Sequence, residues 1–223
     1  MFNLSKTKIK EIFVSIQGEG PQVGKKHIFV RFCKCNLNCE FCDTDFDSKN
    51  AIAYSPRDLY EILKDVDCNI ISLTGGEPLM DVDFLYEFLS KYKDLLGKKI
   101  YLETNGVMYE ELNKIIDYID YVAMDIKILT ATGQQNRFLI NERFLKVATK
   151  KETFIKVVFN ENIIQEEIDF ITSMALKYNL DLILQPKMPM DKNLNLVKVF
   201  DKFYSRCPRV RLIPQVHKFL NLA

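Results

Sequence analysis

Three cysteines lie within eight residues of one another, with the spacing Cys35-x3-Cys39-x2-Cys42. Thiolates this close in sequence can bind one soft metal centre. A structural zinc site usually takes four ligands in two pairs, whereas this motif offers three, and no histidine lies within it. Three thiolates suit a 4Fe–4S cluster with one open iron, and an open iron can bind a small molecule.

Two other interpretations of these cysteines stay open. Cys33 could be the fourth ligand of a zinc knuckle, although it continues the β-rich run 28–32 and is expected to be buried. The three thiols could also be unliganded core residues. The intervening residues are too polar to favour a core, as Lys34, Asn36, Asn38 and Glu40 illustrate.

Composition narrows the class of protein. The chain has 223 residues, of which 48% are hydrophobic and 27% charged, and this excludes a disordered chain, a collagen and a coiled coil. The net charge of +1 disfavours nucleic-acid binding as the main function. No run approaches the length of a membrane span, and lysines interrupt the first residues, so we expect a cytoplasmic protein. In that reducing compartment, clustered cysteines indicate metal or redox chemistry.

Strand-like and helix-like segments alternate along the chain, which predicts a parallel sheet covered by helices. Six helices are expected, at 55–66, 81–96, 110–119, 143–149, 165–178 and 194–204. Strands are expected at 12–16, 28–32, 70–73, 99–103, 121–126, 154–159, 180–184 and 210–213. No linker interrupts the pattern, so residues 1–223 are expected to form a single domain. An incomplete barrel and an open doubly wound sheet both fit this number of strands and helices.

Polar motifs follow five of the predicted strands: QGEG (17–20), TGGEP (74–78), ETNG (103–106), DIK (125–127) and QP (185–186). In folds of this class the site lies where strand carboxyl ends meet loops and helix starts. We therefore expect all five motifs to leave the sheet at the same end and converge on one site.

The cysteine motif, with Phe41 before its last cysteine, resembles the signature of the radical S-adenosylmethionine (SAM) superfamily. The resemblance implies an α/β fold, an incomplete (β/α)6 TIM-like barrel. It also implies that SAM binds the open iron of a 4Fe–4S cluster and is cleaved by an electron from it. The positions that match the cofactor-binding motifs of the superfamily are Phe41, Asp43, Gly76, Glu77, Thr104, Asn105, Lys127, Gln185 and Met188.

The segments EIFVSIQGEG, FVRFC and CNLNCEFCDT are similar to the 7-carboxy-7-deazaguanine synthase family of queuosine biosynthesis. The similarity continues to the terminal R-x-x-P-Q-x-H-K and is weakest over 129–150. One departure is Lys34, which stands where the family usually has glycine before the first cysteine. The resemblance implies conversion of 6-carboxy-5,6,7,8-tetrahydropterin to 7-carboxy-7-deazaguanine and ammonia by ring contraction.

The same resemblance implies a set of ligand positions and partners. Thr44 would bind Mg²⁺, for which a hydroxyl is a suitable hard ligand. Arg31 would hold the substrate carboxylate through its planar fork, and Glu19 would accept N–H groups of the pterin. The full set of substrate positions is Ile16, Gln17, Gly18, Glu19, Arg31, Thr74 and His217. A homodimer and a flavodoxin or ferredoxin electron donor are the expected partners.

Two competing functions share part of this pattern. A radical SAM activase that makes a glycyl radical on a partner protein would have the same cysteine motif, but would not need QGEG, Arg31 or Thr44. A non-catalytic module with structural zinc would be colourless and would not bind SAM.

Overall fold

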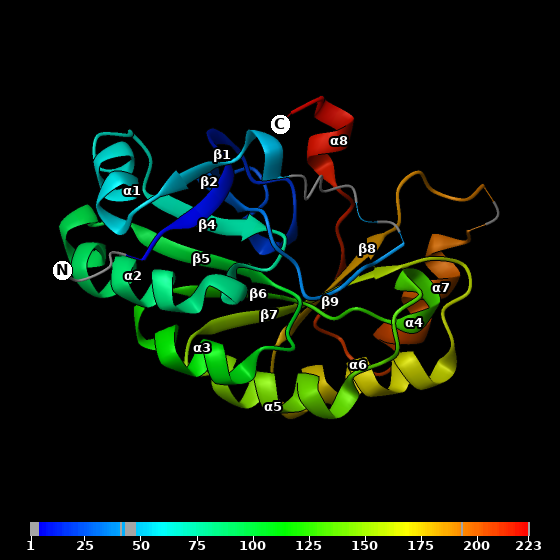
Figure 1. The fold of residues 1–223 in the computed structure, drawn as a ribbon. Helices are drawn as coiled ribbons and strands as arrows, with labels where there is room; N and C mark the ends of the chain where they lie inside the picture. Colours follow the sequence, from blue (N-terminus) through cyan, green and yellow to red (C-terminus); the bar gives the residue numbers. More distant parts are fainter. Residues whose placement is uncertain (1–4, 41, 43–47, 193, 223) are drawn as a thin grey trace.

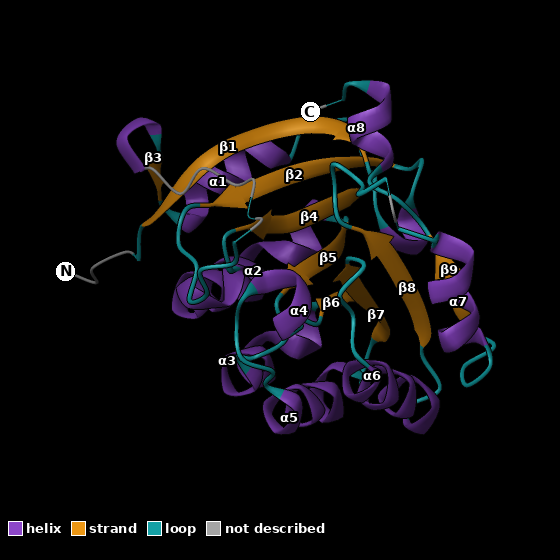
Figure 2. Ribbon diagram, turned by 90° about the vertical axis from the view of Figure 1, so that its right-hand side faces the viewer, coloured by secondary structure: helices purple, strands orange, loops and turns teal. Residues whose placement is uncertain are grey.

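The computed structural model describes residues 5–40, 42, 48–192 and 194–222. Phe41, Asp43 and Thr44 lie outside this set, so their expected roles stay predictions. The strands form a single sheet with the order β3-β1-β2-β4-β5-β6-β7-β8-β9 (Figures 1 and 2). Their bounds are β1 Thr7–Ile16, β2 Lys26–Phe32, β3 Ile52–Tyr54, β4 Ile70–Gly75, β5 Lys99–Thr104, β6 Tyr121–Asp125, β7 Glu152–Phe159, β8 Asp181–Pro186 and β9 Val210–Leu212.

Adjacent strands from β2 through β4–β9 pair in parallel, and β1 pairs antiparallel with both β2 and β3. The sheet is curved (Figure 2), and it is an incomplete barrel because its edge strands β3 and β9 do not pair with each other in the described part of the chain. This confirms the barrel that the superfamily resemblance implies.

Most of the helices cover the outer face of the curved sheet, whereas the last, short helix lies apart from them near the C-terminus (Figure 1). Their bounds are α1 Pro56–Leu63, α2 Val82–Leu96, α3 Tyr109–Ile115, α4 Leu129–Thr132, α5 Phe138–Ala148, α6 Gln165–Lys177, α7 Leu196–Tyr204 and α8 Val216–Leu220. Local signals explain several ends. Ser55 caps α1 in a reciprocal capping box with Asp58, and Gly97 ends α2 in the left-handed conformation.

Side chains alternate along each strand between the helix-facing core and the concave interior. On β2, Ile28, Val30 and Phe32 are fully buried in the main core. A separate small cluster of Tyr101, Ala123, Phe154 and Ile183 comes from β5 to β8, from residues that point the other way. The concave side therefore keeps an apolar floor beneath the polar residues at the strand ends.

The structure corrects one prediction about the motifs. Since β1 runs antiparallel to β2, its last residue Ile16 pairs with Lys26 at the start of β2. The QGEG motif thus leaves the sheet at the end opposite to the other four motifs. It nevertheless folds into the barrel interior, where a Cβ on Gly20 would overlap the ring of Phe154 and contact the hydroxyl of Tyr101.

The predicted helices are all present, with shifted ends. The helix expected at 143–149 begins at Phe138, and the short elements β3, α4 and α8 were not predicted. Among the described residues, no helix has both the length and the apolar character needed to cross a membrane.

Candidate active site

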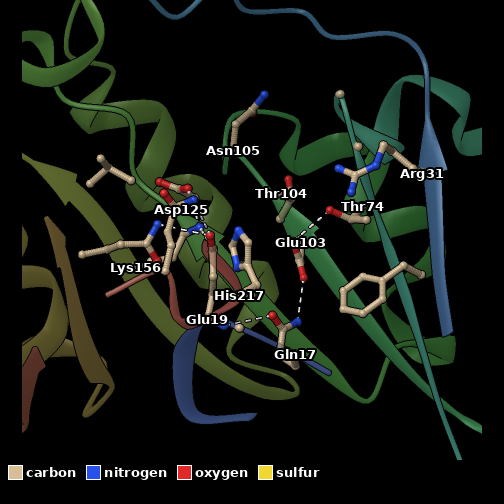
Figure 3. A pocket seen from close by; sticks show the side chains of 18 of the residues that line it. Gln17, Glu19, Arg31, Thr74, Glu103, Thr104, Asn105, Asp125, Lys156 and His217 are labelled. Carbon is tan, nitrogen blue, oxygen red and sulfur yellow. Dashed lines mark hydrogen bonds and ion pairs between the residues drawn. The ribbon is translucent and has the colours of Figure 1, made fainter. Parts of the chain in front are cut away.

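A cavity of about 630 Å³ opens on the concave side of the sheet, at the carboxyl ends of the parallel strands. It brings together residues from β1, β2, β4 to β8 and the C-terminal segment (Figure 3). Every predicted site residue that the structure describes lines this cavity, except Glu77 and Met188. Four of the motifs therefore converge as expected, and QGEG joins them from the other end of the barrel.

The three motif cysteines line the cavity as free thiols. Burial raises the pKa of Cys35 and Cys39, which favours the protonated thiols in the absence of a metal. Cys33 is buried and is not among the residues that line the cavity. Three free thiols facing one cavity form a donor set that fits a 4Fe–4S cluster.

The spacing of these thiols disfavours a zinc knuckle. Within the described ranges, no three His, Cys, Asp or Glu side chains lie close enough together to hold one metal ion. The ligands of a cluster stand farther apart than the ligands of a single ion, because each thiolate binds a different iron.

The loop between the cysteines is held by the segment that contains α4. The backbone N–H of Glu40 donates to the carbonyl of Thr132 at 3.1 Å, and the side-chain amide of Gln134 donates to the carbonyl of Asn38 at 2.7 Å. Glu167 of α6, itself fully buried, anchors this segment by accepting from the backbone N–H of Thr130 at 3.1 Å. The stretch least similar to the family in sequence thus supports the cluster loop.

TGGEP is fastened to the residues that precede the first cysteine. The N–H of Gly76 donates to the carbonyl of Phe32 at 3.0 Å, and the N–H of Glu77 donates to the carbonyl of Lys34 at 2.6 Å. A Cβ on Gly76 would overlap the Lys34 carbonyl group, so only glycine allows this approach. The side chain of Lys34 turns away to Asp81, with Nζ 3.0 Å from Oδ1, so it accommodates the departure from the family pattern.

The Glu77 carboxylate ties TGGEP to ETNG. It is fully buried and accepts hydrogen bonds from the Thr104 hydroxyl at 2.9 Å, the Asn105 N–H at 2.8 Å and the Leu79 N–H at 3.2 Å. Burial outweighs these bonds and raises the pKa of Glu77 to about 7. Its expected contact with SAM stays a prediction, because Gly75 and Gly76 provide the cavity wall at this motif.

Three buried polar atoms at the strand ends have no hydrogen-bond partner among the described residues: Asn105 Oδ1, Asp125 Oδ1 and Gln185 Oε1. Buried polar atoms are almost always paired in native proteins. These acceptors suit a ligand that brings hydroxyl or amino groups, as the ribose, adenine and methionine groups of SAM do.

A second carboxylate, that of the half-buried Glu103, lines the cavity itself. It accepts hydrogen bonds from Gln17 Nε2 at 2.9 Å and from the Thr74 hydroxyl at 2.8 Å (Figure 3). Burial, with a further contribution from the negative charge of Glu19, raises the pKa of Glu103. The sequence contained it within ETNG but gave it no role of its own.

The pKa of Glu19 is shifted in the opposite direction to that of Glu103. Its Oε1 accepts from Gln215 Nε2 at 2.9 Å and Gln185 Nε2 at 3.2 Å, and its Oε2 forms an ion pair with Lys156. Burial alone would raise the pKa of Glu19, but the charge of Lys156 and these hydrogen bonds lower it to about 2. Lys156 is a site residue that sequence reasoning missed.

Arg31 and His217 reach the cavity from opposite ends of the chain. Arg31 Nε donates to Glu11 at 2.6 Å, and the guanidinium lies 5.5 Å from the Phe13 ring centre. The Val216 N–H donates to the Gly18 carbonyl at 2.9 Å, and a Cβ on Gly18 would overlap the His217 ring. The C-terminal segment therefore packs on the QGEG loop and brings His217 to the site.

Comparison with known proteins agrees with this geometry. Residues 29–172 match the family model described as "Radical SAM superfamily". A 7-carboxy-7-deazaguanine synthase of Geobacter sulfurreducens is 32% identical over 96% of this chain and 97% of its own length. A synthase of the same name from Thermoplasma acidophilum is 31% identical over 95% and 96%. The chain belongs to the 7-carboxy-7-deazaguanine synthase family of the radical SAM superfamily.

Solved structures support the fold of this family assignment. The crystal structure of QueE from Escherichia coli matches 95% of both chains with a TM-score of 0.65 at 20% identity. The superfamily match begins after the QGEG motif and ends before Gln185, Gln215 and His217. The cysteine motif, TGGEP, ETNG and DIK thus lie within the common radical SAM core, and several residues around Glu19 come from segments outside it.

Proposed function

We propose that this chain, acting as a single domain in the cytoplasm, converts 6-carboxy-5,6,7,8-tetrahydropterin to 7-carboxy-7-deazaguanine and ammonia by ring contraction, as a step of 7-deazapurine (queuosine) biosynthesis. The observation that carries the proposal is that the three cysteines and the polar set around Glu19, Arg31 and His217 open into one cavity. A metal-binding module would not need the second set beside the first.

The cofactor end of the cavity is built around the cysteines. Cys35, Cys39 and Cys42 would hold a 4Fe–4S cluster, and together with SAM this cluster supplies one-electron chemistry that removes a hydrogen atom from the substrate. The backbone at Gly76 and the side chains of Asn105, Lys127 and Gln185 would bind SAM; in support, they line the same cavity as the cysteines. The close approach of Gly76 to the Lys34 backbone keeps this side of the cavity next to Cys35.

The substrate end is suited to a flat ligand with N–H donors on one edge and a carboxylate. Glu19 is ionised and can accept N–H groups of the pterin edge. Arg31 keeps a planar guanidinium beside the cavity for the substrate carboxylate. Thr74, Gln17 and His217 would complete the contacts, and the apolar floor that includes Tyr101 and Phe154 excludes water beneath the ring.

Three further assignments rest on the family alone. Mg²⁺ would be bound by Thr44 together with oxygens of the substrate, because Mg²⁺ prefers hard oxygen ligands. The chain would act as a homodimer. A flavodoxin or ferredoxin would reduce the cluster.

The experiment is an anaerobic assay of the protein after reconstitution with iron and sulfide. Dithionite, SAM, Mg²⁺ and the carboxytetrahydropterin are added, and carboxydeazaguanine is measured by mass spectrometry. We expect product with the wild type and none with Cys39→Ala, and a raised KM with Arg31→Ala. A brown protein that cleaves SAM without product would favour the activase, and a colourless zinc protein would refute both enzyme functions.

A further inference from the structure

Lys156 lies between two carboxylates that come from distant parts of the chain. It projects from β7 into the cavity, where its Nζ forms an ion pair with Glu19 of the QGEG loop and another with Asp125 Oδ2, at 2.9 Å, at the end of β6 (Figure 3). Its side chain is only 13% exposed. Asp125 Oδ2 also accepts from Lys127 Nζ at 2.9 Å.

The four groups form a row of alternating charge, Glu19, Lys156, Asp125 and Lys127. One end of the row is the carboxylate that faces the proposed substrate, and the other end is the DIK motif of the proposed cofactor site. Burial of any one of these charges without its neighbour would be unfavourable, because only a nearby opposite charge offsets the free energy of desolvating an ion.

A comparison within the cavity isolates what Lys156 does. Glu103 and Glu19 are both carboxylates there, but the hydrogen bonds that Glu103 accepts come from neutral groups, Gln17 and Thr74. The pKa of Glu103 is raised and that of Glu19 is lowered. The charge of Lys156 also lowers the pKa of Glu103, but the direct ion pair that the structure describes is with Glu19.

We propose that Lys156 is a positioning residue: it holds Glu19 ionised and oriented so that the carboxylate can accept the N–H groups of the substrate edge, and it joins this recognition group to Asp125 at the cofactor end. The proposal rests on the proposed function, because the substrate edge is that of the pterin. Gln185 and Gln215 hold the other oxygen of Glu19, so Lys156 supplies the charge and fixes one oxygen while the two amides fix the other.

The other charged groups that face Glu19 do not replace Lys156. Asp125 and Glu103 are carboxylates, from β6 and β5, and they would disfavour the ionised form of Glu19. His217 of α8 contributes a smaller stabilising charge than Lys156. Without Lys156, a buried Glu19 would therefore tend to take up a proton and lose its capacity to accept two N–H groups.

The test is a double-mutant cycle read by calorimetric binding of the carboxytetrahydropterin to anaerobic, cluster-loaded protein without SAM, so that no turnover occurs. The variants are Lys156→Met, Lys156→Arg, Glu19→Gln and the double variant Lys156→Met/Glu19→Gln. Lys93→Met is the matched control, because Lys93 forms a 3.0 Å ion pair with Asp120 at similar exposure, 19% and 16%, and neither residue lines the cavity.

We expect Lys156→Met to weaken binding about tenfold or more and Lys156→Arg to retain part of the affinity. In the Glu19→Gln background the same Lys156→Met change should alter binding by less than about threefold. Relative to the wild type, the affinity of Lys156→Met should recover as the pH rises and Glu19 ionises. Lys93→Met should bind like the wild type.

A readout without substrate separates this proposal from the proposed function. If Lys156 keeps Glu19 ionised, Glu19→Gln should raise the melting temperature of Lys156→Met, increasingly so as the pH rises. Wild type that binds no pterin would refute the proposed function, and the melting comparison would still decide on Lys156. The proposal is overturned if Lys156→Met binds as tightly as the wild type, if its effect is the same with Gln at position 19, or if Glu19→Gln fails to stabilise it.

Discussion

Replacing Gly76 by alanine should damage the cluster site more than the fold. Gly76 does not have a positive φ, so alanine is compatible with the backbone conformation itself. The added methyl group would, however, overlap the carbonyl of Lys34 and lie 3.0 Å from the backbone nitrogen of Cys35. Carbon atoms need roughly 3.5 Å of separation from such neighbours, and the Lys34 carbonyl oxygen lies 1.9 Å from the Cβ position, so the chain before Cys35 must withdraw by about 1.6 Å.

The segment before Cys35 cannot move away from Gly76 without cost, because the 2.6 Å hydrogen bond from the Glu77 N–H to the Lys34 carbonyl joins the same two segments. Overpacking costs about 1–3 kcal/mol, and loss of this bond adds about 1 kcal/mol. The free energy of unfolding should therefore fall by about 2–4 kcal/mol, which lowers the melting temperature of a chain this size by roughly 5–15 °C. The first cluster ligand moves with the segment, so less iron should be retained.

The assay measures iron and sulfide content after anaerobic reconstitution, together with the melting temperature. Gly97→Ala is the control, since Gly97 ends α2 with φ of 62° and has nothing near its Cβ position. It should cost about 1–2 kcal/mol through backbone strain and leave the iron content unchanged. A Gly76→Ala protein that binds a full cluster and melts with the wild type would show that the two segments separate without cost, and the reasoning would be wrong.

Three further substitutions test other contacts. Glu77→Gln places an amide N–H against backbone and hydroxyl donors, so the affinity for SAM should fall in equilibrium binding. Because the pKa of Glu77 is raised to about 7, its ionisation makes the free energy of unfolding of the wild type decline as the pH rises from about 4.5 to 7. Thermal unfolding of the variant should lack this decline. Burial lowers the pKa of His27 to about 4, so the neutral imidazole contributes stability that is lost as the pH falls from about 6.5 to 4. His27→Phe should remove this loss of stability at acid pH, which is worth at most about 3 kcal/mol. A pH profile of stability that is unchanged in the variant would contradict the assignment. Gln134→Ala removes the hydrogen bond to Asn38, so cluster bleaching by a chelator should accelerate while the melting temperature changes by only a few degrees.

Much of the site could be predicted because most of its polar residues lie in short contiguous sequence motifs. A polar run directly after an apolar strand indicates a strand end, and parallel strands present those ends on one side. TGGEP and ETNG, which follow β4 and β5, were placed correctly by that argument alone. Helix ends with strong local signals, such as Ser55, were also predictable.

The direction of β1 could not be predicted, because an alternating strand reads the same whether its neighbour runs parallel or antiparallel. Lys156 was missed because its partner Glu19 is far away in sequence. A lysine within the apolar run of β7 was the available signal, since a charged residue there needs a partner. The helices α4 and α8 are too short to be stable alone and depend on the tertiary contacts that hold them.

The hydrogen bonds that join the C-terminal segment to the QGEG loop have a consequence for how this enzyme could be altered. The loop precedes the shared radical SAM core and the segment follows it, yet Val216 binds Gly18 and Gln215 binds Glu19. The two ends of the chain therefore form one unit that flanks the shared core and holds the proposed substrate residues Gly18 and Glu19. Exchange of either end alone with a distant relative would separate partners that fit each other. New specificities would be reached by exchanging both ends as a pair, with the cysteine loop, TGGEP and ETNG left in place.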